Sequence, residues 1–512
     1  MRFSFQRHDE LPRLAWCARL ERGSPVVRVD HGPWVETHEA YFFEGAWNQE
    51  FAEGRPSLAT VCLGSGAELA GSEEIRFVAP THMLERVHAI EVSDTLWVSN
   101  SLVFLLAASG EELDEHYPFY HFDLMTNMRG YRRYLPSVRM KSGRALRVFF
   151  HTNVLVGPDL QMRTEEKPIP DNYGDYSDYM ARLRRVVSDV TANAGDPARQ
   201  RPYTPLATIS SGYDSPACAL LAKEVGCTEA VTFGQARSGY AEDDDSGREI
   251  ADVLGLHVHE FDRTAYRSLE TFPEAEFLAY GAGGEEVVFS PMETLLPGRV
   301  LFTGYLGDAV WNRVSGRVNT ELLMLYPGGS SLGEFRLRTG FIHFPVPTAG
   351  YIRHPSVYAI SNSGEMKPWA LGNDYDRPIP RRLLEEVGVP RAAFGRTKKA
   401  ITQPLWNTEA LREIMAPRSY GDFAEFVTPL DRFTGPMDAI RFRLMRELYE
   451  VNLRVNWRLM RVARALGFRM TETPLIDERY SRDRGPSSYT FHWGVARTLP
   501  RYAQPLRRSA HN

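Results

Sequence analysis

Short apolar runs alternate with helical patterns between residues 204 and 304, and this alternation constrains the fold more than any other feature of the chain. Apolar runs at residues 205–209, 230–233 and 299–303 predict buried strands, and residues 257–262 predict a further strand. Helices are predicted between them, at residues 215–225 and 242–254. Strands that are joined through helices pair in parallel, with the helices on the faces of the sheet. The fold class expected here is therefore α/β.

The segments on either side of this region have different patterns. The last third is mostly helical, with a long helix predicted over residues 438–466, and residues 158–178 are polar and rich in Pro and Asp, as a linker would be. We expect a β-rich domain at 1–165 and an α/β domain with a helical C-terminal part at 166–512. The alternating strands of the first domain, typical of antiparallel sheets, include residues 74–80, 95–100 and 144–150.

Composition excludes several classes of protein. The chain has 512 residues, 43% hydrophobic and 24% charged, which is typical of an ordered globular protein with more than one domain. Its formal net charge of -5 gives no general attraction to nucleic acid or to anionic lipid, so we expect neither nucleic acid nor a membrane as a partner. The four cysteines form no CxxC pair, which argues against zinc and iron–sulfur sites and favours a reducing compartment. Without a secretory signal or membrane-spanning segment, the expected location is cytoplasmic.

The most informative residues form the turn between the predicted strand at 205–209 and the helix that follows it. In a parallel sheet, ligands bind at the carboxyl ends of the strands, where such turns lie. Small hydroxyl residues and a glycine at the start of a helix expose backbone N–H groups, which suit a phosphate or pyrophosphate. The predicted nucleotide-binding residues are Ser210, Ser211, Gly212, Tyr213, Asp214 and Ser215.

Asp214 is the unusual member of this turn. A carboxylate beside phosphates repels them unless a divalent cation lies between the two groups. Asp214 therefore predicts Mg²⁺ that is bound jointly by the protein and a nucleotide. The turn lacks the GxxxxGK[ST] pattern, which excludes the common phosphate loop of kinases and GTPases.

The sequence SSGYDS at 210–215 resembles SGGxDS, the pyrophosphate loop of ATP pyrophosphatases. The order of the surrounding elements narrows the resemblance to class B asparagine synthetases and β-lactam synthetase, over residues 170–470. The resemblance implies ATP as a co-substrate that is cleaved between its α- and β-phosphates, and a PP-loop fold, similar to the adenine nucleotide α-hydrolases, for the second domain. It also implies that the β-rich domain is similar to the Ntn-hydrolase glutaminase domain of these enzymes.

Residues 303–308, TGYLGD, match the second loop of this family in the expected order. The loop is similar to SGEGxDE of asparagine synthetases and more similar to TGYGAD of β-lactam synthetase. The match implies that Gly304 lies at the nucleotide and that Asp308 binds Mg²⁺ together with Asp214. It further implies that Tyr305 is catalytic and helps to deprotonate the attacking amine, with a partner carboxylate that the sequence does not locate.

Two shorter matches follow the same order. Residues 396–398, RTK, resemble the RxK segment of the family, which implies that Lys398 stabilises charge on the α-phosphate and on the tetrahedral intermediate. Lys399 is the competing candidate for that role. Residues 242–252 resemble the family's acidic helix near the nucleotide, which implies a nucleotide contact for Asp243.

Several positions depart from the family pattern. Ser211 replaces the first glycine of the pyrophosphate loop, where unusual backbone angles or close phosphate approach are expected, and Ala309 replaces a glutamate of the asparagine synthetases. Met1 stands where the glutaminases have their cysteine nucleophile, and Cys17 lies too far inside the chain to replace it. We therefore expect a degenerate first domain without glutaminase activity, and an amine that comes from elsewhere.

The sequence thus predicts an ATP- and Mg²⁺-dependent ligase that adenylates a small-molecule or peptide carboxylate and joins it to an amine, releasing AMP and pyrophosphate. One alternative is a macrolactam cyclase of a ribosomal peptide, or an enzyme that joins two separate molecules. An alternative of another class is a non-catalytic scaffold that binds nucleotide. The sequence leaves open whether the protein forms a homodimer.

Four features have structural explanations beside functional ones. Ser215 is also suited to be a helix N-cap, and His257 and His259 share one face of a strand, where they are either structural or metal ligands. Residues 327–331 are either a mobile flap or a surface loop. The predicted long helix carries arginines that form either a solvated face or a site for an acidic partner: Arg441, Arg446, Arg454, Arg458, Arg461 and Arg464.

Overall fold

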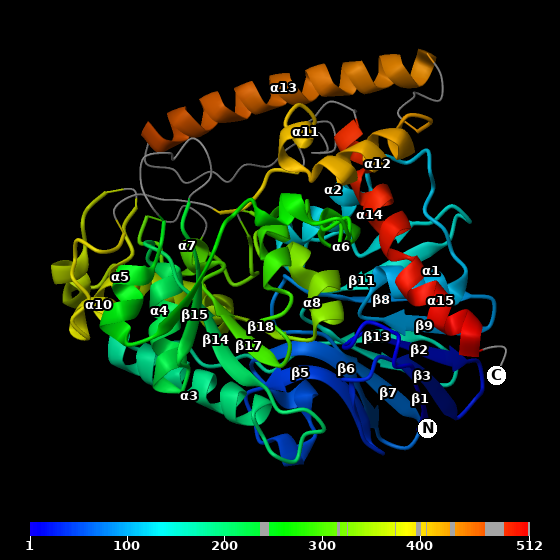
Figure 1. Cartoon of the computed structure of the whole chain (residues 1–512), viewed down its shortest axis with the longest axis horizontal. Helices are drawn as coiled ribbons and strands as arrows, with labels where there is room; N and C mark the ends of the chain where they lie inside the picture. Colours follow the sequence, from blue (N-terminus) through cyan, green and yellow to red (C-terminus); the bar gives the residue numbers. More distant parts are fainter. Residues whose placement is uncertain are drawn as a thin grey trace.

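Three β-sheets form the body of the protein in the computed structural model, and helices cover their faces (Figure 1). Two of the sheets come from the N-terminal part of the chain and the third from the middle. The structure describes residues 1–235, 245–314, 318–324, 326–373, 375–395, 401–405, 407–430, 436–465 and 486–509.

The first two sheets are antiparallel apart from the parallel pair β1 and β3. In spatial order, the seven-stranded sheet consists of β1 (Arg2–Arg7), β3 (Val26–His31), β2 (Trp16–Glu21), β9 (Thr95–Ser99), β8 (Val87–Val92), β11 (Ala145–Phe149) and β10 (Ser137–Arg139). The six-stranded sheet consists of β13 (Met162–Glu165), β12 (Asn153–Val156), β7 (Glu74–Val78), β6 (Cys62–Ala70), β5 (Tyr41–Trp47) and β4 (Glu36–Thr37).

These two sheets share one apolar core between them. Every second residue of β2 and β3 enters this core, and residues of β5, β7 and β12 meet them from the other sheet. Trp16 lies at its centre, with its ring 5.1 Å from the ring of Phe42 and 6.1 Å from that of Phe77. The antiparallel, β-rich character predicted for the N-terminal part is confirmed.

The third sheet is parallel throughout, as the strand–helix alternation predicts. Its five strands lie in the order β16 (His257–Phe261), β15 (Glu229–Phe233), β14 (Thr204–Thr208), β17 (Arg299–Thr303) and β18 (Ile342–Pro345). Chain order runs outward in one direction from β14 to β16, and β17 then pairs with the other side of β14. The order therefore reverses between β14 and β17, and such a reversal opens a crevice at the carboxyl ends of the two strands.

Helix α4 shows how the sequence forms this layer. Its residues 216–222, which are Pro, Ala, Cys and Leu, are all buried, and the helix contacts both β14 and β17. The helix ends at Glu224, and Gly226 follows with φ +93°, a conformation that favours glycine and closes the helix. The helices are α1 (Leu102–Ser109), α2 (Tyr120–Leu124), α3 (Tyr176–Ala194), α4 (Asp214–Glu224), α5 (Arg248–Leu254), α6 (Glu274–Ala279), α7 (Gly307–Val310), α8 (Gly333–Thr339), α9 (His354–Ser361), α10 (Pro378–Glu386), α11 (Leu411–Ile414), α12 (Pro417–Val427), α13 (Pro436–Ala465), α14 (Thr490–Thr498) and α15 (Pro500–Ser509).

Two predicted boundaries need correction. The linker predicted at 158–178 includes β13, which pairs with β12, so only residues 166–175 between β13 and α3 lack a regular element. The helix predicted at 242–254 begins only at Arg248 in the part that the structure describes, because Ser246 instead forms a bridge with Ser210. The long helix near the C-terminus is confirmed as α13.

The cysteines and the helices also bear on the sequence analysis. All four cysteines are buried free thiols, and burial raises the pKa of the Cys17 thiol well above its ordinary value, so that it stays protonated. Among the described helices, none combines the length and the apolar character that crossing a bilayer requires.

Candidate functional site

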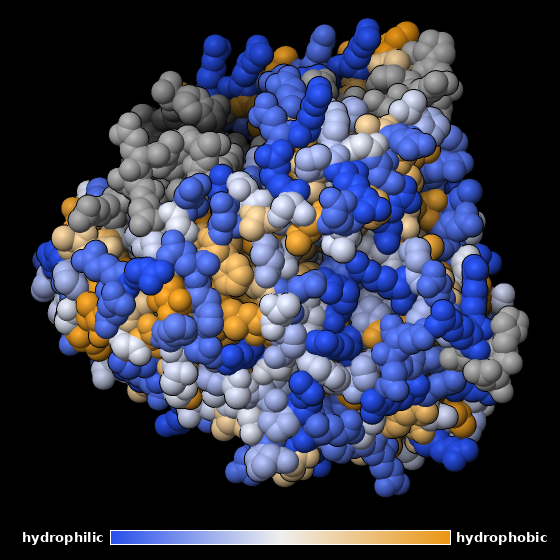
Figure 2. Space-filling model, viewed as in Figure 1, coloured by the Kyte–Doolittle hydropathy of each residue, from blue (hydrophilic) through white to orange (hydrophobic). Residues whose placement is uncertain are grey.

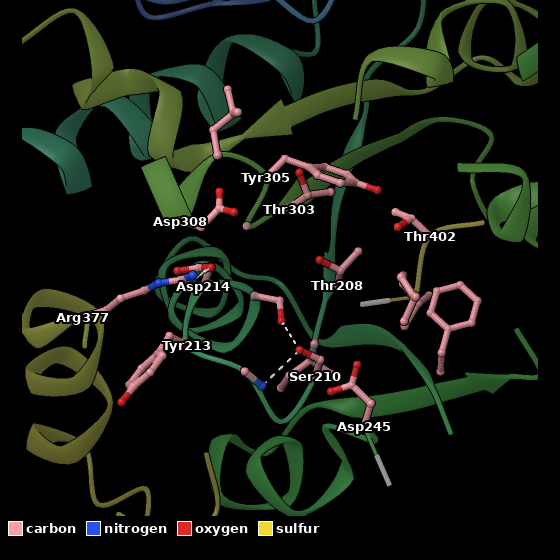
Figure 3. A pocket seen from close by; sticks show the side chains of 18 of the residues that line it. Thr208, Ser210, Tyr213, Asp214, Asp245, Thr303, Tyr305, Asp308, Arg377 and Thr402 are labelled. Carbon is pink, nitrogen blue, oxygen red and sulfur yellow. Dashed lines mark hydrogen bonds and ion pairs between the residues drawn. The ribbon is translucent and has the colours of Figure 1, made fainter. Parts of the chain in front are cut away.

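A cavity of about 240 Å³ lies at the carboxyl ends of β14 and β17, where the strand order reverses (Figure 3). The turn after β14 and the loop after β17 both contribute to it, because the two strands pair directly, with Ala207 opposite Phe302. The cavity is lined by Thr208, Ile209, Ser210, Gly212, Tyr213, Asp214, Ser215, Val231, Phe233, Asp245, Phe289, Thr303, Gly304, Tyr305, Leu306, Asp308, Tyr375, Arg377, Ile401 and Thr402.

The turn at 210–215 is held by its own hydroxyl groups. The backbone N–H of Gly212 donates to Ser210 Oγ at 3.2 Å, and the hydroxyls of Ser210 and Ser215 are 2.7 Å apart. Helix α4 begins at Asp214, and Tyr213 occupies its N-cap position. The interpretation of Ser215 as an N-cap is therefore wrong, because its side chain ties the first turn of the helix back to Ser210.

Ser211 is the one residue of this turn outside the cavity lining. Its N–H donates to the carbonyl of Asp245 at 3.2 Å and its hydroxyl to Asp245 Oδ1 at 3.0 Å. The φ of Ser211 is not positive, so the backbone strain anticipated for a glycine-to-serine replacement does not arise. The side chain of Ser211 thus contacts Asp245, which lines the cavity, while Ser211 itself does not.

The loop after β17 lies so close to the turn that two of its residues must be glycines. A Cβ on Gly304 would lie 2.6 Å from the backbone of Asp214 and Ser215. A Cβ on Gly307 would lie 2.4 Å from Asp214 Cγ and 2.5 Å from Asp214 Oδ1. Leu306, between them, has φ +66°, a left-handed conformation that costs a non-glycine residue about 1–2 kcal/mol. The surrounding structure stabilises a strained loop at the cavity.

Asp214 and Asp308, the predicted cation ligands, both line this cavity. Figure 3 shows the two carboxylates close together on one side of it. Asp214 Oδ1 is buried without a hydrogen-bond donor in the part of the chain that the structure describes. Carboxylate oxygens are the ligands that Mg²⁺ prefers, so this pair fits such an ion. No group of three or more His, Cys, Asp or Glu side chains is arranged to hold a metal ion among the described residues.

Arg377, which the sequence analysis missed, contacts the second oxygen of Asp214. Its guanidinium donates to Asp214 Oδ2, and its side chain is only 4% exposed. The guanidinium carbon also lies 4.9 Å from the ring centre of Tyr375, and burial lowers the pKa of Arg377 to about 9. Arg377 comes 163 residues after Asp214, and no motif marks it, so only the folded chain identifies it as the counter-charge of this carboxylate.

Tyr213 anchors the turn from behind. Tyr213 is fully buried, and in Figure 3 its ring points away from Asp214 and Asp308. Its hydroxyl accepts a hydrogen bond from Arg381 at 2.5 Å. The rings of Tyr375 and Phe394 pack against it, with centroids 4.9 and 5.8 Å away. Its hydroxyl is therefore engaged by Arg381, and its contribution to the site is the fixed position of the turn.

Tyr305 extends over the cavity from the second loop. Its ring lies edge-on to that of His343, 5.6 Å away, while His343 Nε2 contacts the hydroxyl of Thr303 at 2.8 Å. Burial, together with the charges of Glu286 and Glu285, raises the pKa of the Tyr305 hydroxyl well above 10. The phenol is therefore protonated at neutral pH and acts as a hydrogen-bond donor.

Glu286 holds residues 327–331 against Tyr305. Its carboxylate, on the 3₁₀ helix Glu285–Met292, accepts hydrogen bonds from the N–H of Gly329 and from the N–H and hydroxyl of Ser331. A Cβ on Gly329 would lie 3.0 Å from the Tyr305 ring, so the segment packs directly on that side chain. Ser331 is fully buried, so the surface-loop interpretation of this segment is wrong. Burial raises the pKa of Glu286 to about 7.

The lining of the cavity includes both charged and apolar side chains. Asp214, Asp308 and Arg377 gather on one side in Figure 3, and Thr402 lies across the cavity from them. The apolar side chains of the lining are Ile209, Val231, Phe233, Phe289, Leu306 and Ile401. A ligand with a charged group and a flat apolar group matches this distribution.

Other predicted residues lie elsewhere. His259 contacts Glu229 at 2.9 Å, and its ring lies 4.9 Å from that of His257, so the pair belongs to the edge of the sheet and not to the cavity. Asp245 is a cavity residue that the sequence analysis missed, since one aspartate in a run of three cannot be singled out by pattern. Asp243, Lys398 and Lys399 lie outside the described residues, as do Arg396 and Thr397.

Neither a scan against protein-family models nor a search of curated proteins found a match to this chain.

Proposed function

We propose that the protein is an ATP- and Mg²⁺-dependent ligase that forms an amide or lactam through an acyl-adenylate, with a site of the class B asparagine synthetase and β-lactam synthetase type. One observation carries the proposal. The turn after β14 and the loop after β17, which match the family motifs in sequence, meet at one cavity where the strand order reverses, with Asp214 and Asp308 side by side.

The first half-reaction follows from the charged side of the cavity. A substrate carboxylate oxygen attacks the α-phosphorus of ATP, the bond between the α-phosphorus and the bridging oxygen breaks, and pyrophosphate leaves. Turn 210–215 would hold the pyrophosphate through its N–H groups and hydroxyls, and Asp214 and Asp308 would hold Mg²⁺, which neutralises the phosphate charge when bound. The apolar side chains of the lining would contact the adenine ring.

In the second half-reaction, the amine nitrogen attacks the acyl carbon, the bond to the phosphate oxygen breaks, and AMP leaves with the electron pair. The attacking amine must lose a proton. Tyr305 reaches the cavity with a protonated hydroxyl, so it can take that proton only while it passes its own proton to water or to the phosphate of the departing AMP. Its role is therefore that of a relay, and Glu286 is a positioning residue that fixes the segment against which Tyr305 packs.

The bond formed can lie within one molecule or between two. The TGYLGD loop favours the β-lactam synthetase branch, and a cyclase of a ribosomal peptide or an enzyme that joins two molecules uses the same two half-reactions. Lys398, outside the described residues, is our candidate for the group that stabilises the oxyanion and the departing pyrophosphate.

A non-catalytic nucleotide-binding scaffold is the second candidate, and two observations favour it. Arg377 neutralises Asp214 within the protein, so the charge that would attract a cation is already compensated. Ala309 is buried at the position where asparagine synthetases have a glutamate, and the loss of that carboxylate also favours a non-catalytic scaffold.

Exchange of labelled pyrophosphate into ATP separates the two candidates. The ligase predicts exchange that depends on Mg²⁺ and on a carboxylic acid, and Asp214→Asn should abolish it. Binding of Mg²⁺–ATP with no exchange in the presence of any acid from a broad panel would contradict the ligase and support the scaffold.

A further inference from the structure

Helix α13 carries an apolar stripe on its outer face in addition to the one that packs on the protein. Phe442 and Tyr449 are buried on the inner face, and Phe442 stacks on Phe119 with a centroid distance of 6.1 Å. The outer stripe consists of side chains that are 44–74% exposed: Met437, Ile440, Leu444, Leu448, Val451, Val455, Leu459 and Val462. An ordinary surface helix has one apolar stripe, so the second one calls for an occupant.

The side chains of the stripe are exposed, and no described element covers them. α13 lies along one edge of the molecule with no other labelled element beyond it (Figure 1), and blue and orange side chains alternate along that edge in Figure 2. With roughly 100 Å² exposed by each side chain, the stripe offers on the order of 800 Å², as much as one partner contributes to a stable interface. The stripe is therefore large enough to bind a partner surface.

The spacing of the stripe keeps its side chains on one side of the helix. Its residues repeat every 11 positions, as in Met437, Leu448 and Leu459, so the stripe turns by only about 20° in three helical turns. A stripe of this kind stays on one side of a straight helix.

The charged residues of α13 favour an anionic partner surface. Residues 436–465 contain seven arginines and three carboxylates, and Arg441, Arg443, Arg454 and Arg458 are exposed beside the stripe. Two copies of such a helix would repel each other, whereas an anionic surface would attract them. An apolar stripe flanked by arginines is the arrangement with which helices lie in the interface of a bilayer.

We propose that α13 binds the surface of an anionic lipid bilayer, with its outer stripe in the headgroup region and its arginines at the lipid phosphates. This inference is independent of the proposed function of the cavity. It also differs from the expectation based on net charge, because the chain as a whole is negative while α13 is locally positive.

Flotation of the full-length protein with vesicles tests the proposal. We expect binding to phosphatidylcholine vesicles that contain about 30% phosphatidylglycerol, little binding to pure phosphatidylcholine vesicles, and at least a tenfold loss of affinity between about 0.1 and 0.5 M salt. Leu444→Glu combined with Val455→Glu should abolish binding. Both side chains are exposed, so circular dichroism and melting should be unchanged.

Val253→Glu is the matched control, because Val253 is an exposed valine, 43% accessible, on α5. It should bind vesicles like the unmodified protein. The proposal is overturned if no vesicle binds the protein, or if the double substitution binds as well as the control. It is equally overturned if light scattering shows a dimer that the double substitution converts to a monomer, since the stripe would then bind a second copy.

Discussion

Gly307→Ala perturbs the contact between the two loops of the cavity most directly. The added methyl carbon would lie 2.4 Å from Asp214 Cγ and 2.5 Å from Asp214 Oδ1, whereas carbon atoms in contact are about 3.5 Å apart. The added methyl carbon would therefore lie roughly 1 Å too close to the Asp214 carboxylate. Because Arg377 holds the other oxygen of Asp214, the carboxylate cannot swing away without breaking that ion pair. Either Asp214 or the loop that carries Asp308 must shift by about this amount.

The effect on stability should be small and the effect on activity large. Overpacking costs about 1–3 kcal/mol, and alanine regains about 1 kcal/mol over glycine in a helix, so the net loss should be about 0–2 kcal/mol. A domain with 5–15 kcal/mol of stability stays folded after such a loss. A misplacement of about 1 Å at the cation ligands, in contrast, should lower the rate of Mg²⁺-dependent pyrophosphate exchange about 100-fold.

The assay compares Gly307→Ala with a glycine-to-alanine change elsewhere. Gly421 lies in α12, and a Cβ there would meet no atom within 4 Å. Gly421→Ala should keep full exchange activity and gain about 0.5–1 kcal/mol. Both variants are measured by exchange at several Mg²⁺ concentrations and by urea unfolding. Normal exchange and normal Mg²⁺ dependence in Gly307→Ala would refute the reasoning, because Asp214 would then tolerate displacement.

Three further predictions concern Tyr305, Arg377 and Glu286. Tyr305→Phe should slow amine attack about 100-fold while pyrophosphate exchange stays within about threefold, and an equal loss in both half-reactions would contradict the relay role. Arg377→Gln leaves Asp214 without its buried partner and should lower the free energy of unfolding by about 3–5 kcal/mol in cation-free buffer. Mg²⁺ should restore part of this stability in a thermal melt. A loss of stability that Mg²⁺ does not change would be evidence against a cation at Asp214. Burial raises the pKa of Glu286 from an ordinary value of 4.5 to about 7, so between these pH values the folded state binds more protons than the unfolded state. The free energy of unfolding should therefore fall by up to about 3 kcal/mol as pH rises from 4.5 to 7. Glu286→Gln should flatten this part of the pH profile of urea unfolding, and an unchanged slope would show that other groups cause it.

The sequence could predict what depends on local pattern. The parallel sheet follows from apolar strands alternating with helices, and the turn at 210–215 and the loop at 303–308 are recognisable because each is a short segment at the end of a strand. That both would face one cavity does not follow from local pattern, because it depends on the pairing of β14 with β17; that expectation comes from the family resemblance.

What the sequence could not predict depends on distant parts of the chain. Arg377 reaches Asp214 from the segment before α10, and Glu286 reaches residues 327–331 from another element, so neither leaves a periodic or motif signal. Asp245 could not be separated from its two neighbouring aspartates by pattern. The position of β13 was missed because a short polar edge strand has the composition of a linker.

Calorimetric titration of Mg²⁺ in the presence of a non-hydrolysable ATP analogue tests the central claim, that Asp214 and Asp308 share one cation at the nucleotide. Asp214→Asn and Asp308→Asn should each weaken Mg²⁺ binding at least about tenfold, and the double variant should lose little more than either single one, because both remove ligands from the same ion. Losses that add in the double variant, or unchanged binding in either single variant, would contradict it.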